Sequence, residues 1–165
     1  AVIPVEIERL GKNELNEHWL AGPMLRAYGV IWVHRGRPDR KAIRSMLEGL
    51  AEGRMMALAP EGRQSVEGGL EEGTEGAAFL AMKSGAPIVP VAMTGTENEN
   101  IYGHIKRWRR ARVTLSVGKP FFLLEQADRE APKRLRGQKM MREGTRQIMG
   151  SLASLLPESY RGVYK

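Results

Sequence analysis

The sequence of 165 residues contains no cysteine, which excludes disulfide frameworks, cysteine-ligated metal sites and thiol catalysis. It also lacks a long apolar run, because no stretch reaches the roughly 18 consecutive apolar residues that a membrane-spanning helix needs. The opening residues, AVIPVEIERL, carry charges too early for a signal peptide. We therefore expect a chain that does not cross a membrane by itself.

The composition that is present, 42% hydrophobic and 27% charged, predicts one globular domain over residues 1–165. The net charge of +7 is unevenly spread. Residues 101–165 hold 15 Lys and Arg against 5 Asp and Glu, whereas residues 1–100 hold 11 against 14. A basic surface of this kind can meet nucleic acid, an anionic bilayer or acidic molecules, or can simply be solvated, and charge alone does not choose among these.

Apolar periodicity predicts alternating strands and helices. Strands are expected at 2–10, 30–34, 54–60 (a buried one) and 87–93, where Pro90 suggests an edge position or a bulge. Helices are expected at 14–29, 40–53 and 75–85, the second after Asp39 as a cap and ended by Gly53, the third after Thr74. This order predicts an α/β fold, a mostly parallel mixed sheet flanked by helices, with functional loops at the strand ends.

The C-terminal third predicts a strand at 111–121, a polar connection at 125–137 and a final helix. One face of that helix carries Met141, Thr145, Ile148, Met149, Leu152, Leu155 and Leu156. We expect this face to pack on the sheet. A membrane-surface helix is the alternative, which Gly144 and Gly150 weaken.

The stretch APEGRQS at 59–65 places Glu61 and Arg63 in a turn after a strand, where α/β proteins bind ligands. A carboxylate there can accept a hydrogen bond from a substrate hydroxyl, and a guanidinium can bind phosphate or carboxylate. Taken alone, the turn is also typical of a plain surface loop. Gly68 and Gly69 do not form a Walker loop, because no Gly-Lys-Ser/Thr follows.

Three further patterns have simpler interpretations. His34 and Asp39 have the spacing of a His-Asp pair, but Asp39 also fits a helix cap. Glu14 and His18 could hold half a metal site, yet no third ligand is evident and a surface pair is the simpler interpretation. The segment 104–112, HIKRWRRAR, suits phospholipid headgroups and single-stranded nucleic acid equally, or a solvated loop.

Together these segments resemble a known family. Lys12, Leu15, Gly22 and Arg35 spell K-x2-L-x6-G-x12-R, APEGRQS follows, and Val89 to Val91 form a Val-Pro-Val block. The three blocks resemble, in the same order, those of the glycerolipid acyltransferase family, most closely the bacterial 1-acylglycerol-3-phosphate acyltransferases. The resemblance runs from about residue 5 to about residue 118, and less distinctly through the ending LLPESYRGVY.

The resemblance implies roles for matching positions. Lys12 and Arg35 would hold the acceptor phosphate, and Gly22 would be structural. Glu61 would contact the acceptor while Gly62 allows close backbone approach. The resemblance also assigns Val89 and Pro90, in a third block, to support of the site and its acyl-binding side.

Two departures from the family pattern matter. Arg63-Gln64 stands where the family has Thr-Arg, so the guanidinium is displaced by one position. The family's Asn-His-x4-Asp block, whose His is the general base, should precede Lys12 and is absent, so we expect no catalytic residue in this chain. Without a base, the proton-transfer contribution of roughly 100- to 10,000-fold would be lost. We expect the domain to be incomplete, with its N-terminal part missing by truncation.

The resemblance therefore predicts acyl transfer from acyl-CoA or acyl carrier protein to a lysophosphatidate-type acceptor in phospholipid synthesis, with no metal and no bound cofactor. The expected location is peripheral, at the cytoplasmic face of an anionic membrane, and we expect no nucleic-acid partner. The alternative is a non-catalytic lipid-phosphate-binding protein that has lost the base.

Overall fold

The computed structural model describes residues 7–8, 10–12, 31–33, 40–63, 65, 68–97, 100–101, 103–104, 108, 110, 112–123 and 133–165. The chain divides into two compact units, one of residues 1–58 with 82–86 and one of residues 59–81 with 87–165. Each unit has its own strands and helices. The prediction of one domain over residues 1–165 stays a prediction.

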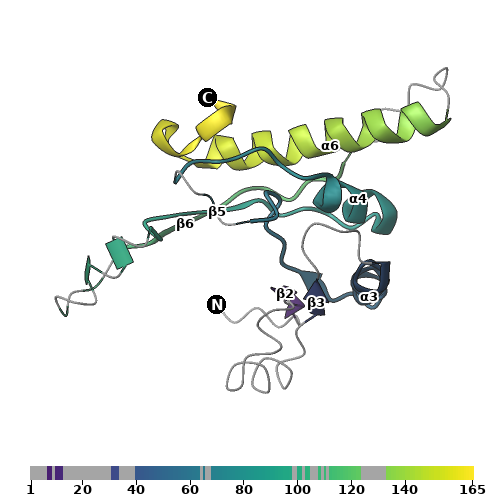
Figure 1. The fold of residues 1–165 in the computed structure, drawn as a ribbon, viewed down its shortest axis with the longest axis horizontal. Helices are drawn as coiled ribbons and strands as arrows, with labels where there is room; N and C mark the ends of the chain where they lie inside the picture. Colours follow the sequence, from purple (N-terminus) through teal and green to yellow (C-terminus); the bar gives the residue numbers. More distant parts are fainter. Residues whose placement is uncertain are drawn as a thin grey trace. The chain divides into compact units, whose positions relative to one another are not determined.

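The first unit contains two parallel strand pairs and a helix. Strand β1 (Ile7–Glu8) pairs with β4 (Met55–Met56), and β2 (Leu10–Lys12) pairs with β3 (Ile31–Val33). Helix α3 (Arg40–Ala51) contacts β3 and β4 (Figure 1). Its buried residues Ala42, Met46 and Gly49 recur at intervals of four and three, so they share one face. The expected parallel strands and flanking helix are confirmed.

Some boundaries differ from the prediction in this unit. Strand β4 has two residues, and Met55 is 39% exposed, so the prediction of a buried strand over 54–60 is wrong at this position. The reason is that β4 pairs with β1 alone among the described strands, over a ladder of only two residues. Gly53 follows α3 with φ 79°, a left-handed conformation that suits glycine after a helix. The helix expected at 14–29 lies outside the described residues.

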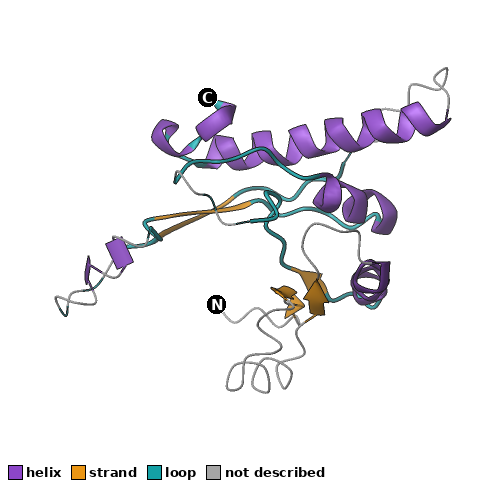
Figure 2. Cartoon of the chain, in the orientation of Figure 1, coloured by secondary structure: helices purple, strands orange, loops and turns teal. Residues whose placement is uncertain are grey.

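Among the described residues of the second unit, helices are longer than strands, and one antiparallel strand pair is present (Figure 2). It contains most of α4 (Glu75–Ser84), then β5 (Val91–Thr94), which pairs with β6 (Thr114–Val117), and α6 (Lys133–Leu155). Two short 3-10 helices, η1 (Glu158–Tyr160) and η2 (Gly162–Tyr164), end the chain. Ala78 of α4 and Ile148, Met149 and Leu152 of α6 form its buried core.

Helix α6 confirms the predicted apolar face and its packing. Thr145, Ile148, Met149 and Leu152 are all at most 8% exposed, and α6 contacts β5. The polar connection predicted over 125–137 is wrong for residues 133–137, which are helical. Lys, Arg, Leu and Gln are good helix formers, and one glycine there costs only about 1 kcal/mol, so Gly137 does not end the helix. None of the described helices is both long and apolar enough to cross a membrane.

Pro90 lies directly before β5 and is buried. Its carbonyl accepts a hydrogen bond from the Gly118 backbone N–H at 2.9 Å. An isolated bridge joins Ile88 to Phe121 on the other side of the proline. Among the described strands β5 pairs with β6 alone, as the proline predicts for an edge strand.

Candidate functional site

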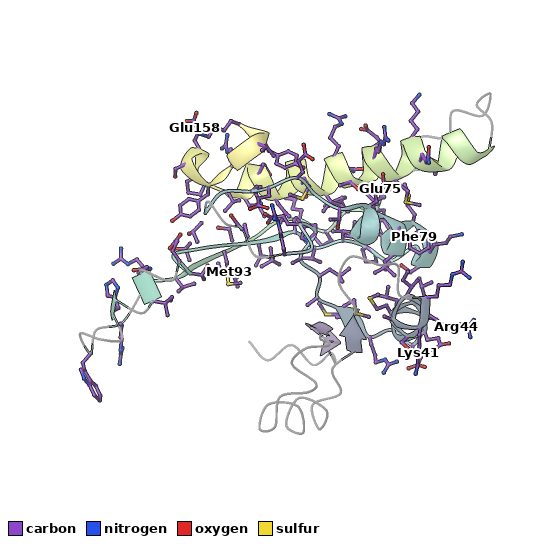
Figure 3. The ribbon with its side chains drawn as sticks, viewed as in Figure 1. Lys41, Arg44, Glu75, Phe79, Met93 and Glu158 are labelled. Atoms are coloured by element: carbon purple, nitrogen blue, oxygen red, sulfur yellow. The ribbon has the colours of Figure 1, made fainter. Side chains whose placement is uncertain are left out.

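The Pro-Glu-Gly turn is closed by backbone hydrogen bonds. The Gly62 N–H donates to the Ala59 carbonyl at 3.0 Å. Gly62 has φ 71°, and a Cβ there would meet Thr74 Cγ2 at 3.3 Å, so this position requires glycine. Thr74 binds the Pro60 carbonyl twice, through its backbone N–H at 2.7 Å and its hydroxyl at 2.9 Å. These bonds fix the turn against the residue that precedes α4, whose first residue, Glu75, is labelled in Figure 3.

Glu61, half-buried in this turn, is held by one backbone donor. Its Oε2 accepts a hydrogen bond from the Glu71 backbone N–H at 2.9 Å. Within the described part of the chain no hydrogen bond reaches Oε1. The carboxylate is therefore oriented through one oxygen, while the other oxygen can accept a hydrogen bond from a ligand hydroxyl.

Arg63 is oriented by the side chain of Glu71. Its Nε donates to Glu71 Oε2 at 2.6 Å, and its Nη2 lies 2.5 Å from the same oxygen. The Arg63 side chain is 62% exposed and that of Glu71 only 19%. A guanidinium has five N–H donors, and this contact occupies two of its nitrogens, so donors remain that can bind an anion. Glu71 thus positions both of the charged site residues predicted in the turn, Glu61 and Arg63.

The segment that carries Glu71 is tied to the end of the chain. The Leu70 N–H donates to the Tyr160 carbonyl at 3.0 Å, and the Val163 N–H donates to the Leu70 carbonyl at 3.1 Å. The Gly73 N–H donates to the Tyr164 hydroxyl at 3.1 Å. We call residues 60–63 and 68–74 the acceptor loop, after the role that the family resemblance implies for Glu61, and we call residues 157–165 the C-terminal clasp. The clasp gives the acceptor loop a second set of fixed points besides the start of α4.

The other predicted site residues lie elsewhere in the chain. Val89 is 42% exposed and Pro90 is buried, and no hydrogen bond or ion pair between described residues links either one to the acceptor loop. Lys12 is the last residue of β2 and is in register with Val33, the last residue of β3, in the first unit. Gly22 and Arg35 lie outside the described residues, so their predicted roles stay predictions.

The two predicted pairs that contain a histidine cannot be compared with the structure. His34, Asp39, Glu14 and His18 all lie outside the described residues. In the part of the chain that the structure describes, no three His, Asp or Glu side chains form a group that could hold a metal ion.

Sequence reasoning missed Glu71 and Tyr164. Glu71 stands beside Glu72, and no local pattern marks which of the two carboxylates is turned inward. The contact of Tyr164 with Gly73 joins residues 91 positions apart, which spacing rules do not reach. The one available signal was the resemblance of the ending LLPESYRGVY to the family.

A comparison with known protein families defines the class of the protein. A family model described as Acyltransferase matches residues 2–94, more than half of the sequence. The chain belongs to the acyltransferase family. The predicted resemblance to glycerolipid acyltransferases is confirmed, and the acceptor loop, but not the clasp, lies within the matched region.

The chain is similar to two individual acyltransferases. The chain is 27% identical over 128 residues to the 1-acyl-sn-glycerol-3-phosphate acyltransferase of Bacillus subtilis (strain 168), covering 77% of this chain and 59% of that protein. The crystal structure of the 1-acyl-sn-glycerophosphate (LPA) acyltransferase PlsC from Thermotoga maritima matches with a TM-score of 0.52 at 23% identity. That match covers 87% of this chain and 56% of the other, and it confirms the α/β acyltransferase fold. The chain spans less than two thirds of the length of both proteins.

Proposed function

We propose that this chain carries the acceptor-binding part of a 1-acylglycerol-3-phosphate acyltransferase, an enzyme of phospholipid synthesis. The observation that supports this proposal is the joint positioning of Glu61 and Arg63 by Glu71, inside the region that the family model matches. The acceptor is lysophosphatidate, which offers both a free hydroxyl and a phosphate monoester. The donor is acyl-CoA or acyl carrier protein.

The acceptor loop can recognise both polar parts of this lipid. Glu61 accepts a hydrogen bond from an acceptor hydroxyl through its remaining oxygen, and Arg63 donates to a phosphate oxygen with N–H groups that Glu71 leaves available. Charge-assisted bonds of this kind are roughly twice as strong as neutral ones. By resemblance, Lys12 and Arg35 add two further cations for the phosphate dianion.

The reaction itself is a simple exchange of bonds. The acceptor oxygen forms a bond to the thioester carbonyl carbon, the carbon–sulfur bond breaks, and the thiol leaves with a proton. The hydroxyl proton passes to a general base, which family resemblance assigns to a His-x4-Asp block. The residues of the acceptor loop bind and orient the acceptor, and we assign no proton transfer to them.

We further propose that the protein works at the cytoplasmic face of a membrane, because its acceptor is a membrane lipid. The C-terminal part, with 15 basic residues against 5 acidic ones, supports attraction to anionic lipid headgroups.

The proposed activity is tested by mass-spectrometric detection of phosphatidate. The purified protein is incubated with lysophosphatidate and either palmitoyl-CoA or palmitoyl-acyl carrier protein. Because the family's Asn-His-x4-Asp block does not precede Lys12 in this sequence, we expect phosphatidate to form only slowly, with at least one donor. The rate should be lower still in Glu61→Gln, which keeps the shape of the side chain but removes its charge. Binding of lysophosphatidate with no product from either donor would instead favour the non-catalytic lipid-phosphate-binding alternative.

A further inference from the structure

The β5–β6 hairpin has an apolar face that the described protein leaves exposed. In its register Met93 pairs with Leu115, and these side chains are both 58% exposed. Val113, two residues before Leu115 on the same face, is 45% exposed. Ala92, which precedes Met93 and lies on the opposite face of the strand, is only 6% exposed. Figure 3 shows Met93 on the side of the hairpin away from α6, the helix that packs on the other side.

The segment that joins β5 to β6 is strongly basic and carries an exposed tryptophan. Residues 95–113, which join the two strands, hold five basic residues, Lys106, Arg107, Arg109, Arg110 and Arg112, against two acidic ones, Glu97 and Glu99. Trp108 is 99% exposed and has φ 51°, a left-handed conformation that is rare for a bulky residue. Arg110 and Arg112 are exposed as well. In Figure 1 the described residues 100–101 and 103–104 lie beyond the end of the hairpin, away from α6.

A fully exposed tryptophan is uncommon in a protein surrounded only by water, because the indole has a large apolar area. At a membrane interface the same side chain is favoured, since its ring lies at the level of the headgroups. Arginine and lysine side chains beside it are attracted to anionic lipids by about 1 kcal/mol each near the surface. Exposed aliphatic side chains next to the tryptophan and the basic residues add apolar area that can enter the membrane interface.

We infer that Met93, Trp108, Arg110, Arg112, Val113 and Leu115 form a lipid-contacting surface that seats the protein on an anionic bilayer. We call this set the hairpin surface. Trp108 enters the headgroup layer, the two arginines bind lipid phosphates, and the aliphatic side chains lie against the outer part of the acyl chains. The occupant is the bilayer itself and not the acceptor molecule bound at the acceptor loop.

Single-stranded nucleic acid fits this surface less well. Proteins that bind it without sequence preference combine cations with several aromatic side chains on which successive bases stack. The hairpin surface has one aromatic residue, Trp108, and its other apolar members are aliphatic. Aliphatic side chains complement lipid chains and offer no flat face for a base.

The inference extends the proposed function, because a lysophosphatidate acceptor resides in a bilayer, but binding to vesicles can be measured without any turnover. The test is cosedimentation of the purified protein with phosphatidylcholine vesicles, with and without phosphatidylglycerol. The variants are Trp108→Ala and the double variant Arg110→Glu/Arg112→Glu. The matched control is Arg142→Glu/Arg146→Glu, which changes the net charge equally at two exposed arginines of α6.

We expect the wild-type protein to bind phosphatidylglycerol vesicles and to release them as the salt concentration rises. Trp108→Ala should weaken binding about tenfold, as loss of one large buried apolar side chain predicts. Arg110→Glu/Arg112→Glu should weaken it at least about tenfold, and clearly more than the α6 control. Equal effects of the two double variants would overturn the inference, as would tighter binding to single-stranded DNA than to vesicles at matched salt.

Two further measurements keep the outcomes distinct. Circular dichroism of each variant establishes that it is folded before its binding is interpreted. Turnover of a water-soluble, short-chain lysophosphatidate should be nearly unchanged in Trp108→Ala. If vesicle binding is lost and soluble turnover is kept, the hairpin surface is supported. If soluble turnover is absent in the wild-type protein while vesicle binding depends on Trp108, the proposed function fails and the hairpin surface stands.

Discussion

The acceptor loop and the hairpin surface belong to the same unit, yet they are built in opposite ways. In the acceptor loop Glu61, Arg63 and Glu71 are fixed by hydrogen bonds and ion pairs at 2.5–2.9 Å. On the hairpin surface apolar side chains are 45–99% exposed, and among the described residues no ion pair involves Arg110 or Arg112. The first arrangement suits a small ligand that must be oriented, because its polar groups are positioned before binding.

The second arrangement suits an extended partner that adapts to the protein. Lipid headgroups move freely, so arginines facing them need no fixed geometry. We therefore propose that the fixed side chains bind the acceptor, and that the exposed apolar side chains contact the bilayer. Four predictions test the fixed contacts of the acceptor loop. Each removes or strains a contact that holds the loop or the C-terminal clasp.

The largest effect is expected from Gly162→Ala in the C-terminal clasp. Gly162 has φ 54°, and a Cβ there would lie 2.0 Å from the Leu70 carbonyl oxygen, a backbone atom that cannot easily move. We expect the free energy of unfolding to fall by roughly 2–4 kcal/mol in urea denaturation, from backbone strain and overpacking together.

The control for this variant is Gly150→Ala, an exposed position within α6 where nothing lies within 4 Å of the new Cβ. This substitution should stabilise the protein by about 0.5–1 kcal/mol. Destabilisation by both variants to the same extent would contradict a specific role for the contact between Gly162 and Leu70.

A smaller loss is expected from Tyr164→Phe, which removes one hydroxyl. The Gly73 N–H then loses its acceptor in a partly buried setting. We expect the unfolding free energy to fall by about 1 kcal/mol. Hydrogen exchange at the Gly73 amide, measured by NMR, should become faster in the variant, and an unchanged exchange rate would show that the contact does not form in solution.

Glu71→Gln should alter binding more than stability. The ion pair with Arg63 is exposed on the arginine side, so its loss should change the unfolding free energy by less than about 1 kcal/mol. The glutamine oxygen can still accept from Arg63, while one negative charge near the proposed phosphate site is gone. We therefore expect lysophosphatidate to bind about threefold more tightly in titration calorimetry. Weaker binding would mean that the charge of Glu71 is needed to orient Arg63.

The smallest effect concerns the contact of Glu97 with Tyr160, which anchors the start of the clasp. The Tyr160 phenol donates a hydrogen bond to the Glu97 carboxylate, and this bond lowers the pKa of Glu97 below 4.5 and raises the pKa of Tyr160 above 10.0. Its contribution is therefore complete between these two values. It is lost as pH falls through the lowered pKa of Glu97, and as pH rises through the raised pKa of Tyr160.

The measurement for this contact is the difference in unfolding free energy between the wild-type protein and Tyr160→Phe across a pH series. The difference should form a plateau that declines at both ends. A difference that stays constant from acid to alkaline pH would show that the two groups are not coupled.

The sequence predicted the features that depend on local pattern. The α6 face and the parallel pairing of short strands both follow from apolar periodicity. What it could not predict depends on contacts between distant segments. The orientation of Glu61 and Arg63 is set by Glu71, and the clasp is joined to the loop by Tyr160 and Tyr164, which no spacing rule connects to positions 70–73.

For the hairpin surface, too, the sequence predicted the local pattern but not the contacts with distant segments. The basic run around Trp108 was visible in the sequence, and so were the alternating residues of β6. The sequence could not show that the apolar side chains of this strand face away from α6, because alternation alone does not say which face the core covers.

The most direct test of the account is whether Arg63 binds the acceptor phosphate. Titration calorimetry would compare lysophosphatidate with the 1-monoacylglycerol of the same chain length, in the wild-type protein, Arg63→Ala and the charge-matched control Arg142→Ala. The account predicts that Arg63→Ala weakens lysophosphatidate binding about tenfold, while the control and the phosphate-free lipid show no such loss. Equal binding of lysophosphatidate by all three proteins would contradict it.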